Sequence, residues 1–214
     1  MRGSREEISA RQQGYLTEFA SADDILDVGC GRGEFLVLLR DAGKRATGID
    51  IDADMVAQCR DEGLDVVRAE AVEHLSGLAS ESLGGIFAAQ VVEHLPPAEL
   101  VAFLAAARVA LAPGGVIVLE TINPASLCAL RNYFADLTHA QPLVPETLSF
   151  LVESAGFTGP RIAYTSPVPD RGRLIDVPFG DAIPAEALAA SRRNIELLNG
   201  LLFAPQDYAV IAGG

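Results

Sequence analysis

The chain has 214 residues, 50% of them hydrophobic and 21% charged, so it can bury its own core and is too apolar for a disordered or fibrous protein. Its formal net charge of −13 would repel a nucleic acid, and no basic patch offsets it, so we expect no nucleic-acid partner. No apolar run approaches the roughly 20 residues that cross a bilayer. The N-terminal stretch carries charge throughout, so we expect no signal peptide, no membrane insertion and a cytoplasmic location. Cys30, Cys59 and Cys128 form neither a metal pair nor an even disulfide set, and we interpret them as reduced thiols.

The first half of the chain alternates between two patterns. Residues 5–20 place apolar side chains near one face, which predicts an amphipathic helix. From residue 24 to 121, short apolar runs alternate with helical patterns, which predicts a parallel sheet with crossover helices. The predicted strands are 24–28, 45–50, 64–69, 83–90 and 115–121, and the predicted helices are 33–43, 52–62, 71–79 and 97–111.

The pattern loosens after residue 121. Helices are predicted at 125–135, between Pro145 and Gly156, and at 184–200; strands are predicted at 160–165 and 207–212, with a Pro/Gly-rich loop at 166–183. The whole order predicts an α/β fold: a Rossmann-like doubly wound sheet of about seven strands with a late antiparallel strand. The N-terminal helix and a helical and loop insertion over the site complete this expected architecture.

The sharpest local motif is LDVGCGRGEFL at 26–36, which leaves a strand, turns through three glycines and enters a helix. Gly29, Gly31 and Gly33 let the backbone approach a ligand closely, and the helix start offers unpaired amides. The spacing is G-x-G-x-G rather than the G-x-G-x-x-G of dinucleotide sites, and Asp27 would repel a pyrophosphate but attract an ammonium group. The loop therefore predicts a cationic ligand and disfavours a nicotinamide cofactor. A tight turn without any ligand is the simpler alternative.

Acidic residues follow the next two strands. Asp50, with Ile51 beside it, ends the second predicted strand, where a carboxylate can accept both hydroxyls of a ribose. Asp52 is expected to cap the next helix. Glu70 and Ala71 follow the third strand and could flank an adenine, although a surface position explains Glu70 as well.

These motifs, together with LAPGGVIVLE at 111–120, resemble the class I S-adenosylmethionine-dependent methyltransferases. The resemblance covers roughly residues 24–121, and DYAVIA at 207–212 suits the last antiparallel strand of that fold. It implies S-adenosylmethionine as the cofactor and a single domain over 1–214, with a cofactor-binding half at 21–121 and an acceptor-binding half at 122–214. The residues implied to bind the cofactor are Tyr15, Asp27, Gly29, Gly31, Arg32, Gly33, Asp50, Ile51, Glu70, Ala71, Gln90 and Val91.

Acid–base groups follow the fourth and fifth predicted strands, at the edge where open α/β sheets keep their sites. Glu93 and His94 are adjacent after the fourth strand. His139 is predicted in a loop, with Asp136 close enough in sequence to orient its imidazole. Carboxylate and imidazole groups together can hold a divalent cation, but a helix-terminal acid and a capping histidine explain Glu93 and His94 equally well.

The resemblance extends to this second region. Some small-molecule and RNA-end methyltransferases carry Glu-x-x-Glu-His after this strand and bind magnesium through it, with a further histidine downstream. Gln90 stands at the first of these positions, which leaves Mg²⁺ open, with Glu93, His94 and His139 as the candidate ligands. Four further motifs lie between residues 119 and 212: LETINP, DLTHAQPL, PETLSFLVESAGF and LLFAPQDYAVIA. Together they resemble bacterial sugar O-methyltransferases that cap or modify polysaccharides, such as O-antigen chain terminators and mycobacterial methylmannose polysaccharide enzymes.

The leading hypothesis is an O-methyltransferase that acts on a hydroxyl of a sugar or oligosaccharide in a glycan precursor. His139 would be the general base, directly or through a metal, with Glu93 and His94 beside it. The alternative is a methyltransferase for a phenol, a quinone intermediate or another small metabolite, and a non-catalytic scaffold of the same fold is a third possibility. The N-terminal helix and the 184–200 helix could cover the site or pair two subunits in a homodimer.

Overall fold

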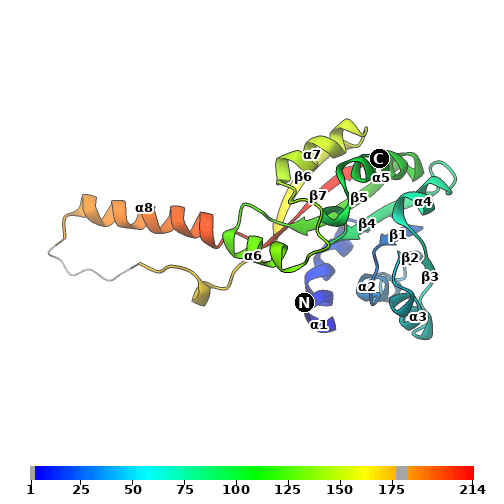
Figure 1. Ribbon diagram of the computed structural model, residues 1–214, viewed down its shortest axis with the longest axis horizontal. Coiled ribbons are helices and arrows are strands. Elements are labelled where there is room, and N and C mark those ends of the chain that lie inside the picture. Colours follow the sequence, from blue (N-terminus) through cyan, green and yellow to red (C-terminus); the bar gives the residue numbers. More distant parts are fainter. Residues whose placement is uncertain (1–2, 177–182) are drawn as a thin grey trace.

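The computed structural model describes residues 3–176 and 183–214, which contain a seven-stranded sheet in the order β3-β2-β1-β4-β5-β7-β6 (Figure 1). β7 runs antiparallel to both of its neighbours, β5 and β6, whereas β1 to β5 pair in parallel. The strands are β1 (Ile25–Val28), β2 (Ala46–Asp50), β3 (Val66–Arg68), β4 (Leu83–Ala89), β5 (Leu111–Ile122), β6 (Thr158–Thr165) and β7 (Asp207–Gly213). This confirms the predicted sheet and its late antiparallel strand.

Helices cover both faces of the sheet, as expected of a doubly wound fold. α4 (Ala71–Ser76), α5 (Pro97–Ala110) and α7 (Pro145–Ser154) bury apolar side chains against one face. On the other face, α2 (Glu34–Asp41) and the segment after α1 pack Phe35 and Phe19 against Phe87 of β4. α3 (Ala53–Asp61) packs beside α2 through a small cluster that includes the buried Cys30 and Cys59.

Two element boundaries differ from expectation for local reasons. The N-terminal helix is α1 (Arg5–Gln12) and then becomes the 3₁₀ helix η1 (Gln13–Thr17), where Gly14 weakens the α-helical preference. β5 begins at Leu111 rather than residue 115, because Leu111 already pairs with Leu83. The strand is irregular at this point: its pairing with β4 shifts register between Leu83 and Gly85, and Gly114 has a φ of +78°.

The acceptor-binding half divides into two parts. α6 (Leu127–Ala135) and the loop after it lie beside the sheet body, whereas α8 (Ala185–Leu202) projects away from it with the 3₁₀ helix η3 (Asp170–Gly172) (Figure 1). The late helix therefore projects away from the strand ends and does not cover them as expected (Figure 1); it contacts α6 and, through Asn199, the backbone of Leu174. Across the described residues, no helix combines the length and apolar character needed to cross a membrane.

Candidate active site

The glycine loop between β1 and α2 requires glycine at its turns. Gly29, Gly31 and Gly33 have φ angles of +66°, +55° and +76°. These values lie in the left-handed region, where a residue with a side chain is strained. A Cβ atom on Gly29 would lie 2.5 Å from Cγ2 of Val91, and one on Gly33 would lie 2.5 Å from Cδ1 of Leu64. The loop thus has the tight turn that its glycines predict, and the protein's own Val91 and Leu64 lie directly against it.

Asp50 ends β2 and braces this loop. Its Oδ2 accepts a hydrogen bond from the Gly31 amide at 2.8 Å, and its Oδ1 accepts one from the Asp52 amide at 2.9 Å. A carboxylate offers about four acceptor positions, so two remain for the hydroxyls of a ribose. Asp52 caps α3 through the Asp54 amide, as the sequence predicts.

Most other predicted cofactor residues lie along the same edge of the sheet. Asp27 is buried near the end of β1, and Ile51 is 62% exposed just after β2. Glu70 stands at the start of α4 without capping that helix, and Ala71 follows it. These positions continue from β1 to β3 along neighbouring strand ends, which is where this class of sheet binds ligands.

Arg32 and Tyr15 have protein partners. The Arg32 Nε donates to Glu34 at 2.7 Å and its Nη2 to the Gly3 carbonyl at 3.0 Å, so the side chain ties the loop to the N-terminal segment. The Tyr15 hydroxyl donates to Oε2 of Glu120 at 2.6 Å. Their contact with the cofactor remains a prediction.

Glu120 belongs to a buried polar network at the ends of β4, β5 and β7. The Gln90 amide lies 3.4 Å from Oε1 of Glu120 and 3.3 Å from Oδ1 of Asp207. Burial, reinforced by the Asp207 charge, raises the pKa of the Glu120 carboxyl. Gln90 has a φ of +59°, a strained conformation for a non-glycine residue that is typical of functional sites. Asp207 could not be predicted from the local sequence, because only the placement of β7 beside β5 brings it here.

The second polar centre unites Glu93, His94 and His139. One ligand atom of each residue lies within 4.8 Å of the others. The 3₁₀ helix η2 (Val92–His94) carries the first two, and the Ala140 amide donates to the Glu93 carbonyl at 2.8 Å, which anchors the His139 loop beside it. Glu93 is fully buried, and neither carboxylate oxygen has a hydrogen-bond partner among the described residues. Burial raises the pKa of this carboxyl to about 7.

Hydrogen bonds define the tautomers of both histidines. Thr138 Oγ1 donates to Asp136 at 2.6 Å, so it accepts from Nδ1 of His94 at 3.0 Å. Nδ1 of His139 lies 2.6 Å from the Tyr133 carbonyl, which can only accept. Both Nδ1 atoms therefore carry a proton, and in each neutral ring Nε2 keeps a lone pair. Burial and the proximity of His139 lower the pKa of His94, which favours its neutral form.

Asp136 makes no hydrogen bond to His139 among the described residues, contrary to one expected role. Its carboxylate accepts from the amide and hydroxyl of Thr138, which contacts His94, while its charge interacts with both imidazoles. His139 is held by the Tyr133 carbonyl and by the Tyr133 ring, which stacks on the imidazole with 4.5 Å between the ring centroids. Asp136 accepts from Thr138 because the backbone becomes extended at Asp136, just after α6, and brings the Thr138 amide within reach of the carboxylate.

A cavity of about 460 Å³ lies at the opposite end of the strands. It is lined by Ile25 and Ala46, the first residues of β1 and β2, and by Lys44 and Arg45. Because open α/β sheets bind ligands at the carboxyl ends of their strands, this cavity is not part of the candidate site.

Comparison with known proteins agrees with this geometry. Residues 26–119 match the family model of a methyltransferase domain. The crystal structure of a SAM-dependent methyltransferase from Archaeoglobus fulgidus is 38% identical and superimposes with a TM-score of 0.95, over 100% of this chain and 96% of that one.

Two curated relatives match over shorter stretches. A probable S-adenosylmethionine-dependent methyltransferase from Mycolicibacterium smegmatis is 30% identical over 144 residues, 66% of this chain and 54% of the relative. A ubiquinone biosynthesis O-methyltransferase from Methylococcus capsulatus is 36% identical over 125 residues, 56% of this chain and 50% of the relative. The chain thus spans about half the length of the curated relatives it matches. With the strand order, the glycine loop and the full-length structural match all in agreement, the chain belongs to the class I S-adenosylmethionine-dependent methyltransferases.

Proposed function

We propose that this methyltransferase transfers its methyl group to a hydroxyl of a small molecule. The observation that carries the proposal is the polar centre of Glu93, His94 and His139, because it combines an unpartnered buried carboxylate with two imidazole lone pairs. This centre follows Val91, which packs against Gly29 of the glycine loop. Proton-accepting groups would thus stand next to the proposed position of the reacting methyl group.

The proposed cofactor site uses groups along the strand ends. Asp27 and the three loop glycines would hold the methionine part, Asp50 the ribose, and Ile51 with Glu70 and Ala71 the adenine; Gln90 and Val91 would face the sulfur. When bound, S-adenosylmethionine supplies a methyl group on a positively charged sulfur, which an acceptor oxygen can displace in line.

The chain's own part is to align the acceptor and remove its proton. In the proposed mechanism, Nε2 of His139 takes the hydroxyl proton as the new carbon–oxygen bond forms. The Tyr133 carbonyl holds the opposite ring nitrogen, so the imidazole presents its lone pair at Nε2 and is stabilised once protonated. Glu93 is fully buried beside it and would favour that positive charge when ionised.

The same three residues also fit a divalent cation. Each histidine donates Nδ1–H to a fixed oxygen, the outer arrangement that orients metal-binding imidazoles. Two imidazoles and one carboxylate suit Mn²⁺, Fe²⁺ or Zn²⁺ better than Mg²⁺. The amide of Gln90 lies within hydrogen-bond distance of Glu120 and Asp207 and so adds no ligand. A cation held here would act as a Lewis acid that lowers the pKa of the acceptor hydroxyl.

Two acceptor classes are proposed. The sugar or oligosaccharide hydroxyl follows from the resemblance of residues 119–212 to glycan-modifying enzymes, and the acidic network of Glu120 and Asp207 offers acceptors for further hydroxyls. A phenolic or quinone-type acceptor is favoured by a relative named as a ubiquinone biosynthesis O-methyltransferase.

The test is methyl transfer from isotopically labelled S-adenosylmethionine to panels of mannosides, other sugars and catechols, with and without added divalent cations. We expect one panel to be methylated, and His139→Ala to lose at least ~100-fold in turnover while it still binds the cofactor. The control is His74→Ala, the third histidine, which lies in α4 outside the centre. A His139→Ala protein with full turnover, or labelling of nitrogen compounds only, would refute the proposal.

A further inference from the structure

The arm that contains α8 covers residues 166–204 of the sequence. Its described parts, residues 166–176 and 183–204, stand clear of the sheet body (Figure 1). α8 has 18 residues, and Asn199 is its one buried side chain among those described. The Asn199 side chain accepts a hydrogen bond from the Leu174 amide and donates one to the Leu174 carbonyl, both at 2.8 Å. These bonds hold α8 against the segment that contains Leu174. A helix with so little packing is marginal in water, because most helical stability in proteins comes from a buried apolar face.

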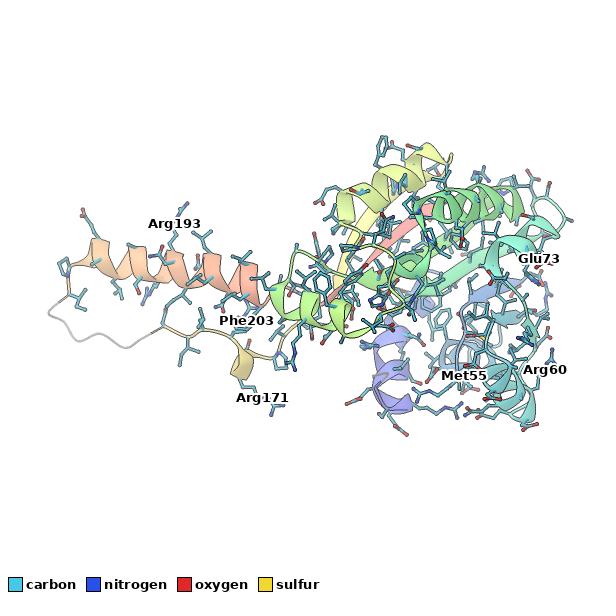
Figure 2. The ribbon with its side chains drawn as sticks, viewed as in Figure 1. Met55, Arg60, Glu73, Arg171, Arg193 and Phe203 are labelled. Atoms are coloured by element: carbon cyan, nitrogen blue, oxygen red, sulfur yellow. The ribbon has the colours of Figure 1, made fainter. Side chains whose placement is uncertain are left out.

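The outer surface of α8 carries an unpaired apolar stripe. Its members recur at alternating spacings of three and four residues and are all exposed: Ala187, Ala190, Asn194, Leu197 and Leu201. Leu197 and Leu201 are 62% and 53% exposed. Figure 2 shows Arg193, the neighbour of Asn194, on the side of α8 that faces away from segment 166–176. The stripe is thus separate from the face that holds Asn199.

This spacing is that of a coiled-coil seam, in which one polar asparagine among apolar positions selects register and partner number. Asn194 lies at the middle of α8, which runs from Ala185 to Leu202. Antiparallel pairing with an identical helix would set the alanine half of each stripe against the leucine half of the other, so that small side chains meet large ones. We propose that α8 pairs antiparallel with α8 of a second copy of this chain along the outer stripe.

Charge favours the arm as the place where two copies meet. The arm holds four arginines and five acidic residues, whereas the rest of the chain holds 12 basic and 24 acidic residues. Two sheet bodies would therefore repel each other, but two arms would not. The full-length match to the Archaeoglobus fulgidus crystal structure includes the arm.

The base of the arm is joined to the proposed catalytic centre. Ser126 Oγ donates to the Ala204 carbonyl at 2.9 Å, and the Asn123 side chain donates to the Pro205 carbonyl at 2.9 Å. Both donors precede α6, whose Tyr133 carbonyl holds His139. Pairing of the two arms would therefore restrict the motion of α6 and of the His139 that it holds. A consequence for catalysis rests on the proposed function, whereas the pairing itself does not.

The first test is the mass of the full chain in solution, measured by sedimentation velocity from about 1 to 50 μM. We expect a dimer for the wild type and a monomer for the Leu197→Glu/Leu201→Glu variant. The control is Phe150→Glu on α7, which changes an equally exposed apolar residue (64%) outside the arm and should remain dimeric. A monomeric wild type, or a dimer that survives both leucine changes, would overturn the proposal.

The second test fixes the orientation by oxidative crosslinking. Asn194→Cys places its thiol near the centre of the pair, so we expect a covalent dimer. Glu186→Cys lies eight residues away. Antiparallel pairing would separate its two copies by about 24 Å at 1.5 Å per residue, so it should not crosslink. Equal crosslinking of both variants would refute the antiparallel arrangement, and circular dichroism verifies that each variant is folded.

Discussion

Glu93 couples the free energy of unfolding to pH, and Glu93→Gln should remove this coupling. Burial raises the pKa of its carboxyl from an ordinary 4.5 to about 7. Between these values the folded state holds a proton that the unfolded state releases, so the wild type loses stability as pH rises through this range. Each pH unit between these two pKa values lowers the free energy of unfolding by about 1.4 kcal/mol. The wild type therefore loses ~3 kcal/mol of stability above pH 7 that it retains below pH 4.5.

Glutamine keeps the shape of this side chain and cannot ionise. We therefore expect Glu93→Gln to exceed the stability of the wild type by only ~1 kcal/mol near pH 5 and by ~3 kcal/mol at pH 8. The assay is urea unfolding followed by circular dichroism at pH 5, 6, 7 and 8, with a chelator present. Glu99→Gln, the same change at an exposed position in α5, serves as the control and should alter stability little at any pH. Stability curves for Glu93→Gln and wild type that stay parallel from pH 5 to 8 would refute the reasoning.

Three further outcomes test the cofactor loop and the histidine geometry. Asp50→Ala should weaken S-adenosylmethionine binding ~10–100-fold in calorimetry, since it removes a charged acceptor and the brace of the loop; unchanged affinity would exclude Asp50 from the site. Gly29→Ala should destabilise the protein by ~1–3 kcal/mol in thermal unfolding, and by more than Gly43→Ala, which has a similar φ but open space around it. Thr138→Val removes the acceptor for Nδ1 of His94, so turnover should fall about 10-fold with cofactor affinity unchanged; Thr138→Ser should restore it, and a valine variant with full turnover would count against the assigned tautomer.

Local sequence was sufficient to predict the cofactor half of the fold. The alternation of apolar runs and helical patterns predicts β1 to β5 in order, and each observed boundary lies within a few residues of its prediction. Gly29, Gly31 and Gly33 mark the loop because all three have left-handed backbone, and close packing also excludes a side chain at Gly29 and Gly33. The Asp52 side chain caps α3 through amides of the first helical turn only, so this cap could also be predicted from the sequence.

Contacts between segments that are distant in the sequence could not be predicted from these local patterns. Asp207 reaches Gln90 only because β7 inserts between β5 and β6, a pairing set by burial of both sheet faces rather than by any local pattern. The partners of the two histidines were likewise undetermined, because Thr138 and Tyr133 meet them through the path of the chain after α6. The sequence alone determined the cofactor loop and the residue types of the polar centre. The tertiary structure decided their protonation, since burial and hydrogen-bond partners arise only when distant segments pack together.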